Sequence, residues 1–152
     1  MTPAGRSLRD LAPDELVHLD ADGGERAEGG RATSELQLHL AAYRVRPDVA
    51  CVIHTHPPHV TAWSKTGALF PLDTVGAIES LGAIGFARYE PAGSVALADA
   101  CAAWFASPVE SVVMERHGLT CVGATLEDAF LRTDLAEQTA HLEAAARSLN
   151  AG

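Results

Sequence analysis

The chain has 152 residues, 47% of them hydrophobic, and a formal net charge of −9. This length predicts a single domain over 1–152 with a sizeable core and is short for two domains. The acidic balance and the scattered Lys and Arg residues argue against a nucleic-acid partner, and no apolar segment is long enough to span a membrane. A soluble, cytoplasmic protein is therefore expected.

The N-terminal part of the chain predicts a hairpin followed by a helix. The hairpin has arms at 16–20 and 25–28, which an Asp-Gly turn joins. The helix covers 35–45, with Thr33 or Ser34 as its cap. Three apolar residues at helical spacing form its expected buried stripe: Leu36, Leu40 and Tyr43.

Glu35 and His39 are one helical turn apart and share the neighbouring face of this helix. Both can point toward a common site at the helix start, where the helix dipole favours a carboxylate. The alternative is a capping acid and a packed histidine, and for His39 the packed role is favoured.

A buried strand is predicted from the apolar run 49–53 into His56, where a Pro-Pro pair ends it. A short helical turn follows at 60–64. The apolar, glycine-rich section 67–87 does not divide clearly into elements.

Ser94 is expected to cap a helix that runs through Phe105 and buries one face, and strands should follow on either side of His117. The residues of that buried face are Leu97, Cys101 and Trp104. Thr125 and Asp128 resemble a capping box that opens a long amphipathic helix toward Ser148. Its apolar members include Leu126, Phe130 and Leu142. This mixed order predicts an α/β architecture with a largely antiparallel or mixed sheet.

The cysteines predict free, buried thiols and no disulfide framework, because they are odd in number and lie within apolar runs. They are Cys51, Cys101 and Cys121. A catalytic Cys–His pair is a weaker alternative, since Cys51 lies three residues before His54 and faces the other side of the predicted strand.

Three histidines supply a pattern that fits one divalent metal ion. His54 and His56 are two residues apart on a strand, so both point to the same side, and His117 adds a third imidazole before a glycine. Three protein ligands leave one position open for substrate, which is typical of catalytic zinc. Imidazole also suits iron, cobalt, nickel and copper. The alternative is a His-x-His pair that serves only the strand.

These residues resemble the class II aldolase and adducin head family over almost the whole chain. The matching segments are Thr33-Ser34-Glu35, His39, Tyr43-Arg44, Arg46-Pro47-Asp48, His54-Thr55-His56-Pro57, Ala62, Tyr89, Gly93-Ser94, His117-Gly118 and Gly123. A Ser-Glu that precedes His-x-His, with a later His-Gly, is a specific signature.

The resemblance implies a three-layer α/β/α sandwich around a central, mostly antiparallel sheet, assembled as a homotetramer with active sites at subunit interfaces. It matches His54, His56 and His117 to the metal ligands and Glu35 to the catalytic acid/base. The implied ion is Zn²⁺, with Mn²⁺, Fe²⁺ or Co²⁺ as alternatives. Such an ion polarises a carbonyl and its neighbouring hydroxyl so that an enediolate can form.

The sequence also departs from the family pattern. In typical members several dozen residues, including a phosphate-binding Gly-Asn loop, precede the Thr-Pro-x-Gly segment that here begins at Thr2. The remaining donors for an anion are Thr2, Gly5, Thr33 and Ser34. A weaker phosphate site, a non-phosphorylated substrate and a truncated chain stay open. The tyrosine that often donates a proton in these aldolases has no match near Asp73, and Tyr89 is only a distant substitute.

The sequence thus predicts a metal-dependent lyase, of aldolase or decarboxylase type, for a small hydroxylated carbonyl or sugar-like substrate. The first alternative is an epimerase or dehydratase of the same fold. The second is a non-catalytic interaction module like the adducin heads. A cupin-like oxygenase is disfavoured because its glutamate normally follows the histidine pair, whereas Glu35 precedes it.

Overall fold

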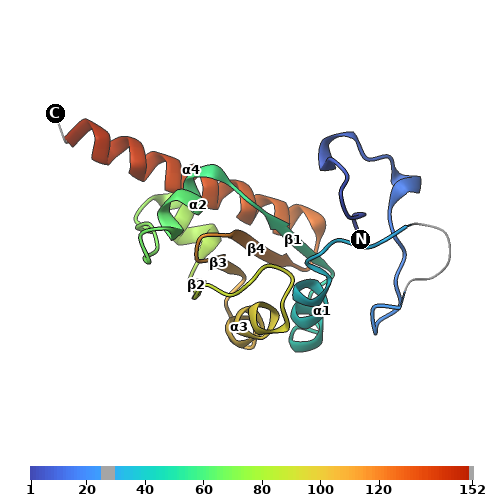
Figure 1. Ribbon diagram of the computed structural model, residues 1–152. Helices are drawn as coiled ribbons and strands as arrows, with labels where there is room; N and C mark the ends of the chain where they lie inside the picture. Colours follow the sequence, from blue (N-terminus) through green and yellow to red (C-terminus); the bar gives the residue numbers. More distant parts are fainter. Residues whose placement is uncertain (25–29, 151–152) are drawn as a thin grey trace.

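The computed structural model describes residues 1–24 and 30–150, and it shows one sheet with helices on both faces (Figure 1). The elements in chain order are η1 (Leu8–Asp10), η2 (Pro13–Glu15), α1 (Leu36–Val45), β1 (Cys51–Thr55), α2 (Pro58–Ser64), η3 (Ala77–Leu81), β2 (Ile84–Ala87), α3 (Val95–Phe105), β3 (Ser111–Met114), β4 (Gly118–Gly123) and α4 (Leu126–Asn150). Among the described residues, no helix combines the length and apolarity that a bilayer crossing requires.

The sheet has the strand order β1-β4-β3-β2. β4 pairs antiparallel with both β1 and β3, and β2 pairs parallel with β3. The predicted mixed, mostly antiparallel sheet is confirmed. β1 forms one edge, so the strand that carries His54 is paired on a single side.

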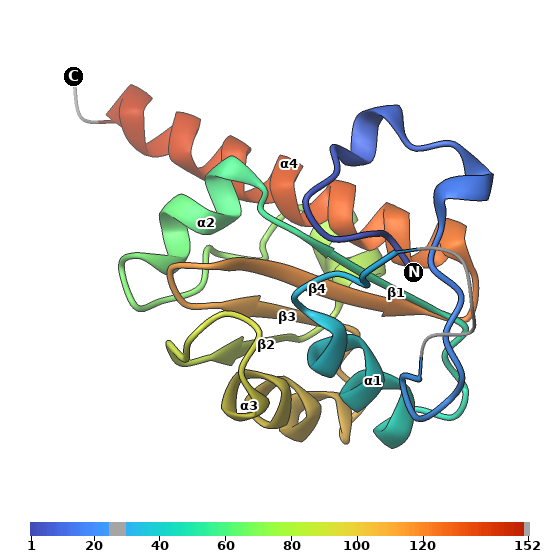
Figure 2. The ribbon, with the colours of Figure 1, turned by 45° about the vertical axis from the view of Figure 1, so that its right-hand side comes forward.

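Two hydrophobic cores lie on the two faces of the sheet, because alternate strand residues point in opposite directions. Val112 and Met114 of β3 pack with residues of α1 and α3, whereas Val113 packs with residues of α2, η3 and α4. Figure 2 shows α1 and α3 below the sheet and α2 and α4 above it. This is the predicted three-layer α/β/α sandwich.

Local capping signals locate the C-terminal helices correctly. The Ser94 side chain accepts a hydrogen bond from the Leu97 amide, at 3.1 Å. Thr125 and Asp128 form a reciprocal capping box in which each side chain accepts a hydrogen bond of 3.1 Å from the other residue's amide. The helices therefore begin where the sequence predicted.

The predicted buried faces of the helices are partly wrong. Tyr43 of α1 and Trp104 of α3 are exposed, as are the α4 residues Leu126, Phe130 and Leu142. Other side chains take the buried positions, and in α4 these are the small ones. The buried residues of α1 are Leu38, Leu40, Ala41 and Ala42, and those of α4 are Ala129, Ala136, Thr139 and Ala140.

The predicted hairpin near the N-terminus is present only as its turn among the described residues. The Asp20 amide donates to the Gly24 carbonyl at 2.9 Å, and the Gly23 amide donates to the Asp20 carbonyl at 3.1 Å. The second predicted arm, 25–28, lies outside the described residues. The section 67–87, which the sequence left undivided, contains η3 and β2.

Candidate metal and acid/base site

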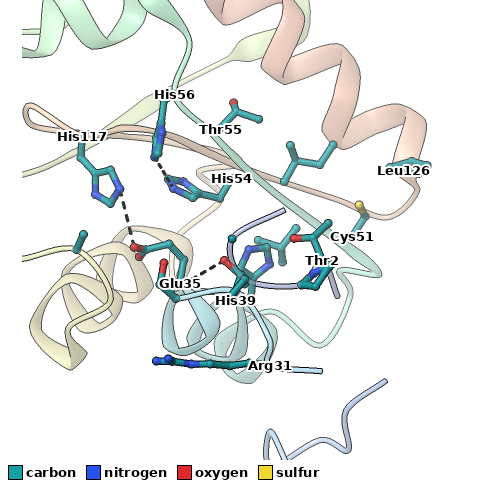
Figure 3. A pocket seen from close by; sticks show the side chains of 18 residues that line it. Thr2, Arg31, Glu35, His39, Cys51, His54, Thr55, His56, His117 and Leu126 are labelled. Carbon is teal, nitrogen blue, oxygen red and sulfur yellow. Dashed lines mark hydrogen bonds and ion pairs between the residues drawn. The ribbon is translucent and has the colours of Figure 1, made fainter. Parts of the chain in front are cut away.

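The three predicted ligand histidines lie together at the end of β1 and the start of β4. The nitrogen atoms that they can offer to an ion all lie within 4.8 Å of one another. In Figure 3 the three rings point toward one another, and the Nε2 atoms of His54 and His56 are 3.1 Å apart. We call these residues, His54, His56 and His117, the histidine cluster.

The imidazole of His54 is oriented by contacts from the paired strand. His54 Nδ1 lies 3.1 Å from the Leu119 carbonyl oxygen and 3.2 Å from Thr120 Oγ1 on the paired strand β4. A carbonyl can only accept, so Nδ1 carries the proton and Nε2 keeps its lone pair for an ion. The tautomer of His54 is therefore the one a metal ligand needs.

His117 occupies the tight turn between β3 and β4. The turn closes through a 3.1 Å hydrogen bond from the His117 amide to the Met114 carbonyl, and Arg116 adopts a left-handed backbone with φ of 57°. The Arg116 amide donates to Ser64 Oγ at 2.9 Å, which ties the turn to α2. A Cβ atom at the next residue, Gly118, would lie 2.8 Å from His56 Cδ2. The His-Gly motif thus lets β4 approach His56.

Glu35 is buried beside the histidine cluster, with 5% of its surface exposed. Its Oε1 atom is 4.0 Å from His117 Nε2, and Figure 3 shows the carboxylate directed at that ring. Glu35 Oε2 and His117 Nδ1 are buried without a hydrogen-bond partner among the described residues. Buried polar atoms are normally paired. These two atoms are therefore available to a bound group.

Burial sets the charge state of two rings of the cluster, His54 and His117. It lowers the pKa of His54 to about 3, with further lowering from the neighbouring His117 and His56. Burial also lowers the pKa of His117, although Glu35 opposes the shift. Both rings are consequently neutral at neutral pH, and their lone pairs are free for coordination.

The donor set fits a divalent transition-metal ion. A tetrahedral ion with metal–nitrogen distances of about 2.0–2.1 Å requires ligand nitrogens about 3.3 Å apart, close to the spacing of His54 and His56. Three imidazoles and no thiolate match zinc and the borderline first-row metals. The cluster is also the one group of metal-ligating side chains with this proximity among the described residues.

The cluster opens into a cavity of about 800 Å³ that also contains the residues predicted to bind an anion: Thr2, Gly5, Thr33 and Ser34. The N-terminal segment reaches this place because it pairs with the residues before α1. The Ala4 amide donates to the Arg31 carbonyl at 2.8 Å, and the Thr33 amide donates to the Thr2 carbonyl at 3.1 Å. Gly93, with φ of 73°, packs against the Ser34 carbonyl, where a Cβ atom would lie only 2.9 Å away.

Arg31, His39 and Leu126 also line the cavity. Sequence reasoning did not single out Arg31, although a cation two residues before Thr33-Ser34 was a usable signal. It favoured a packed role for His39, and the structure places this ring in the cavity wall, where burial lowers its pKa to about 4. Nothing in the sequence joined Leu126 to this site, because the contact depends on tertiary structure.

Cys51 and Tyr89, the weaker candidates from the sequence, do not have the features of catalytic residues. Cys51 lines the cavity, but burial raises the pKa of its thiol, with a contribution from Glu127, so it lacks the character of a reactive thiolate. Tyr89 is half exposed, and the Arg116 guanidinium carbon lies 4.2 Å from the centroid of its ring. Tyr89 is not among the residues that line the cavity. All three cysteines are free.

Comparison with known proteins agrees with this geometry. Residues 1–144 match the model of the class II aldolase and adducin N-terminal domain. The chain is 34% identical over 142 residues to L-fuculose phosphate aldolase of Methanocaldococcus jannaschii, and 32% identical over 142 residues to that of Methanococcus vannielii; each alignment covers 93% of this chain and 76% of the relative.

Among solved structures, YgbL of Escherichia coli, described as a candidate aldolase/epimerase/decarboxylase, superposes with a TM-score of 0.84 at 27% identity. That match covers 93% of this chain and 70% of YgbL. Because the family model matches nearly the whole chain and the fold is shared, the chain belongs to the class II aldolase and adducin N-terminal domain family.

Proposed function

We propose that this protein is a metal-dependent lyase that cleaves a carbon–carbon bond in a small hydroxylated carbonyl compound. The observation that carries the proposal is the convergence of three imidazoles, two of them kept neutral by burial, beside the buried side chain of Glu35. A structural metal site would close around its ion, whereas here the cluster faces a cavity large enough for a sugar-sized molecule.

His54, His56 and His117 would hold the ion, Zn²⁺ being the first choice. The ion would act as a Lewis acid that polarises the substrate carbonyl and stabilises negative charge on the enediolate. Glu35 is the general acid/base in this proposal. Its Oε2 atom has no hydrogen-bond partner among the described residues, so it is available to take or give a proton at a bound substrate.

We further propose that the substrate carries a phosphate or similar anion. Thr2, Gly5, Thr33 and Ser34 would offer hydroxyl and amide donors from the lining of the cavity, and Arg31, which also lines it, adds a positive charge. The relatives named above act on L-fuculose phosphate, which supports a phosphorylated sugar as the substrate class.

The test is a comparison of wild type with Glu35→Gln in metal content and in turnover of phosphorylated ketoses. The variant keeps the shape of the side chain but cannot carry the proton, so metal content should stay near one ion per chain while turnover falls about 10²- to 10⁴-fold. The matched control is Glu79→Gln, an exposed residue on η3 that does not line the cavity. Near-normal turnover in Glu35→Gln would refute the assigned role.

An epimerase is the second candidate, because an ion and a carboxylate at these positions suit that chemistry as well, and YgbL carries both names. Product mass separates the two reactions. An aldolase gives two smaller fragments, whereas an epimerase preserves the mass of its substrate; decarboxylation releases carbon dioxide and dehydration releases water.

A homotetramer with active sites between subunits completes the proposal. The exposed apolar residues Leu126, Phe130 and Leu142 on α4 support an association of copies, which would remove them from water. Light scattering measures the mass directly, against a chain mass of 15.9 kDa.

A further inference from the structure

Glu137 of α4 makes four contacts with the first turn of α2, outside the site cavity. Its carboxylate oxygens accept hydrogen bonds from the His59 amide at 3.1 and 3.0 Å and from the Val60 amide at 3.1 Å. Its Oε1 atom also lies 2.7 Å from His59 Nδ1. One carboxylate thus binds both the backbone and a side chain of a segment 78 residues away.

α2 depends on this carboxylate because it lacks a cap of its own among the described residues. The residue at the cap position is Pro57, which makes no side-chain hydrogen bond, and the helix begins with Pro58. The first amides of any helix have no partner within the helix, and a negative charge near them is favourable. Glu137 of α4 therefore accepts the hydrogen bonds of the first amides of α2, which a local Ser or Asp would normally accept.

A short, rigid segment joins His56 to α2, so the position of α2 determines that of His56. Only Pro57 and Pro58 separate His56 from His59, and the proline rings restrict both φ angles. A shift of the first turn of α2 therefore moves the backbone of His56. His56 and Glu137 also line one small cavity of about 260 Å³.

The other end of the connection is fixed as well. Ala136 and Ala140, on either side of Glu137 along α4, are fully buried against the sheet. The indole of Trp63 in α2 donates a 3.1 Å hydrogen bond to the Ala140 carbonyl. Figure 2 shows α2 lying along α4. α4 thus provides a firm base from which Glu137 holds α2.

We propose that Glu137 is a positioning residue of the metal centre, which holds His56 at its place in the histidine cluster through α2 and the two prolines. The inference rests on the proposed metal site. Glu137 does not line the site cavity and acts only through the segment that it binds.

The test measures Zn²⁺ affinity by chelator competition on the full chain, for wild type, Glu137→Gln and Glu143→Gln. Glu143 lies on the same helix and pairs with Arg147 at 2.7 Å, and Arg147 lies over the Trp63 ring of α2 at 4.4 Å. Glu143→Gln is therefore the same substitution at a residue that reaches α2 only through another side chain. We expect Glu137→Gln to bind Zn²⁺ about 10- to 100-fold more weakly, the usual range for residues that orient metal ligands, and Glu143→Gln to bind like wild type.

A second readout separates positioning from general stability. The visible spectrum of the Co²⁺-loaded protein reports ligand geometry, and it should change in Glu137→Gln but not in Glu143→Gln. A purely structural role would lower the melting temperature and leave affinity and spectrum unchanged, which would overturn the inference.

If Glu137→Gln does not fold, Glu137→Asp decides, because it keeps the charge but shortens the reach to the His59 and Val60 amides. A several-fold weaker affinity supports the proposal, and wild-type affinity overturns it. If wild type itself binds no Zn²⁺ or Co²⁺, the metal site fails and this inference fails with it.

Discussion

At the scale of single residues, the site depends on small features next to each histidine. The carbonyl of Leu119 fixes the tautomer of His54, and the absence of a side chain at Gly118 leaves room for His56. The sequence predicted His54 and His56 because their spacing is local, and His117 from the glycine after it and the family resemblance. It could not predict which neighbours hold them, since Leu119 and His54 meet only when β1 pairs with β4.

Gly118→Ala should therefore damage the proposed metal site. The added methyl group would lie 2.8 Å from His56 Cδ2 and even closer to the backbone oxygen of Thr55, and backbone cannot move aside cheaply. We expect a loss of about 1–3 kcal/mol in the free energy of unfolding, typical of overpacking, together with weaker Zn²⁺ binding. Urea denaturation and chelator competition measure the two effects.

Gly76→Ala is the control for this substitution. A Cβ atom at Gly76 meets only Leu135 Cδ2, at 3.5 Å, which is an ordinary contact, and the backbone there is right-handed helical. Stability should stay constant or rise slightly, with unchanged Zn²⁺ affinity. Equal behaviour of the two variants would show that Gly118 is not needed for close approach.

At the scale of elements, the accuracy of sequence reasoning follows the range of the interactions involved. Caps and prolines are local, so α3 and α4 begin where Ser94 and the Thr125–Asp128 box predicted. β2 could not be found in the same way, because it is defined by parallel pairing with β3, more than twenty residues later. Tyr43 and Trp104 were wrongly expected to be buried, since helical spacing does not say which of two apolar faces meets a neighbour.

The capping box of α4 makes a test at this scale. Thr125→Ala and Asp128→Ala each remove one side-chain acceptor for an amide at the helix start, so each should lower the free energy of unfolding by about 1 kcal/mol. The two losses should not add fully in the double variant, because the bonds are reciprocal. Ser148→Ala, exposed at the other end of the helix, should be neutral in the same denaturation series.

At the scale of the whole molecule, the cavity joins parts of the chain that the fold alone brings together. The N-terminal strip lies beside the start of α1, and that start faces β1 and the turn before β4. The family resemblance predicted this grouping, whereas composition and periodicity could not. The contact between His59 and Glu137 was also not predicted, because the two residues are 78 positions apart and no local pattern indicates it. The single domain over 1–152 stays a prediction.

Burying histidines at this cavity should make the metal-free protein sensitive to mild acid. The pKa values of His39 and His54, about 4 and about 3, lie below the ordinary value of 6.5 because burial disfavours the charged form. Between pH 6.5 and 4 the unfolded chain therefore binds more protons than the folded chain, so the free energy of unfolding falls as pH falls. From pH 7.5 to 5.0 the loss should be about 2 kcal/mol for each histidine.

Urea denaturation of the chelator-treated protein across this pH range measures the effect, and His39→Gln supplies the comparison. The variant cannot titrate at this position, so its stability should decline less steeply by about 2 kcal/mol over the same interval. Asp48 does not interfere, because pairing with Arg46 lowers its pKa to about 2, which confines its contribution to more acidic solutions. Parallel curves for wild type and His39→Gln would mean that the cavity hydrates the ring of His39 and lets it take up a proton in the folded state.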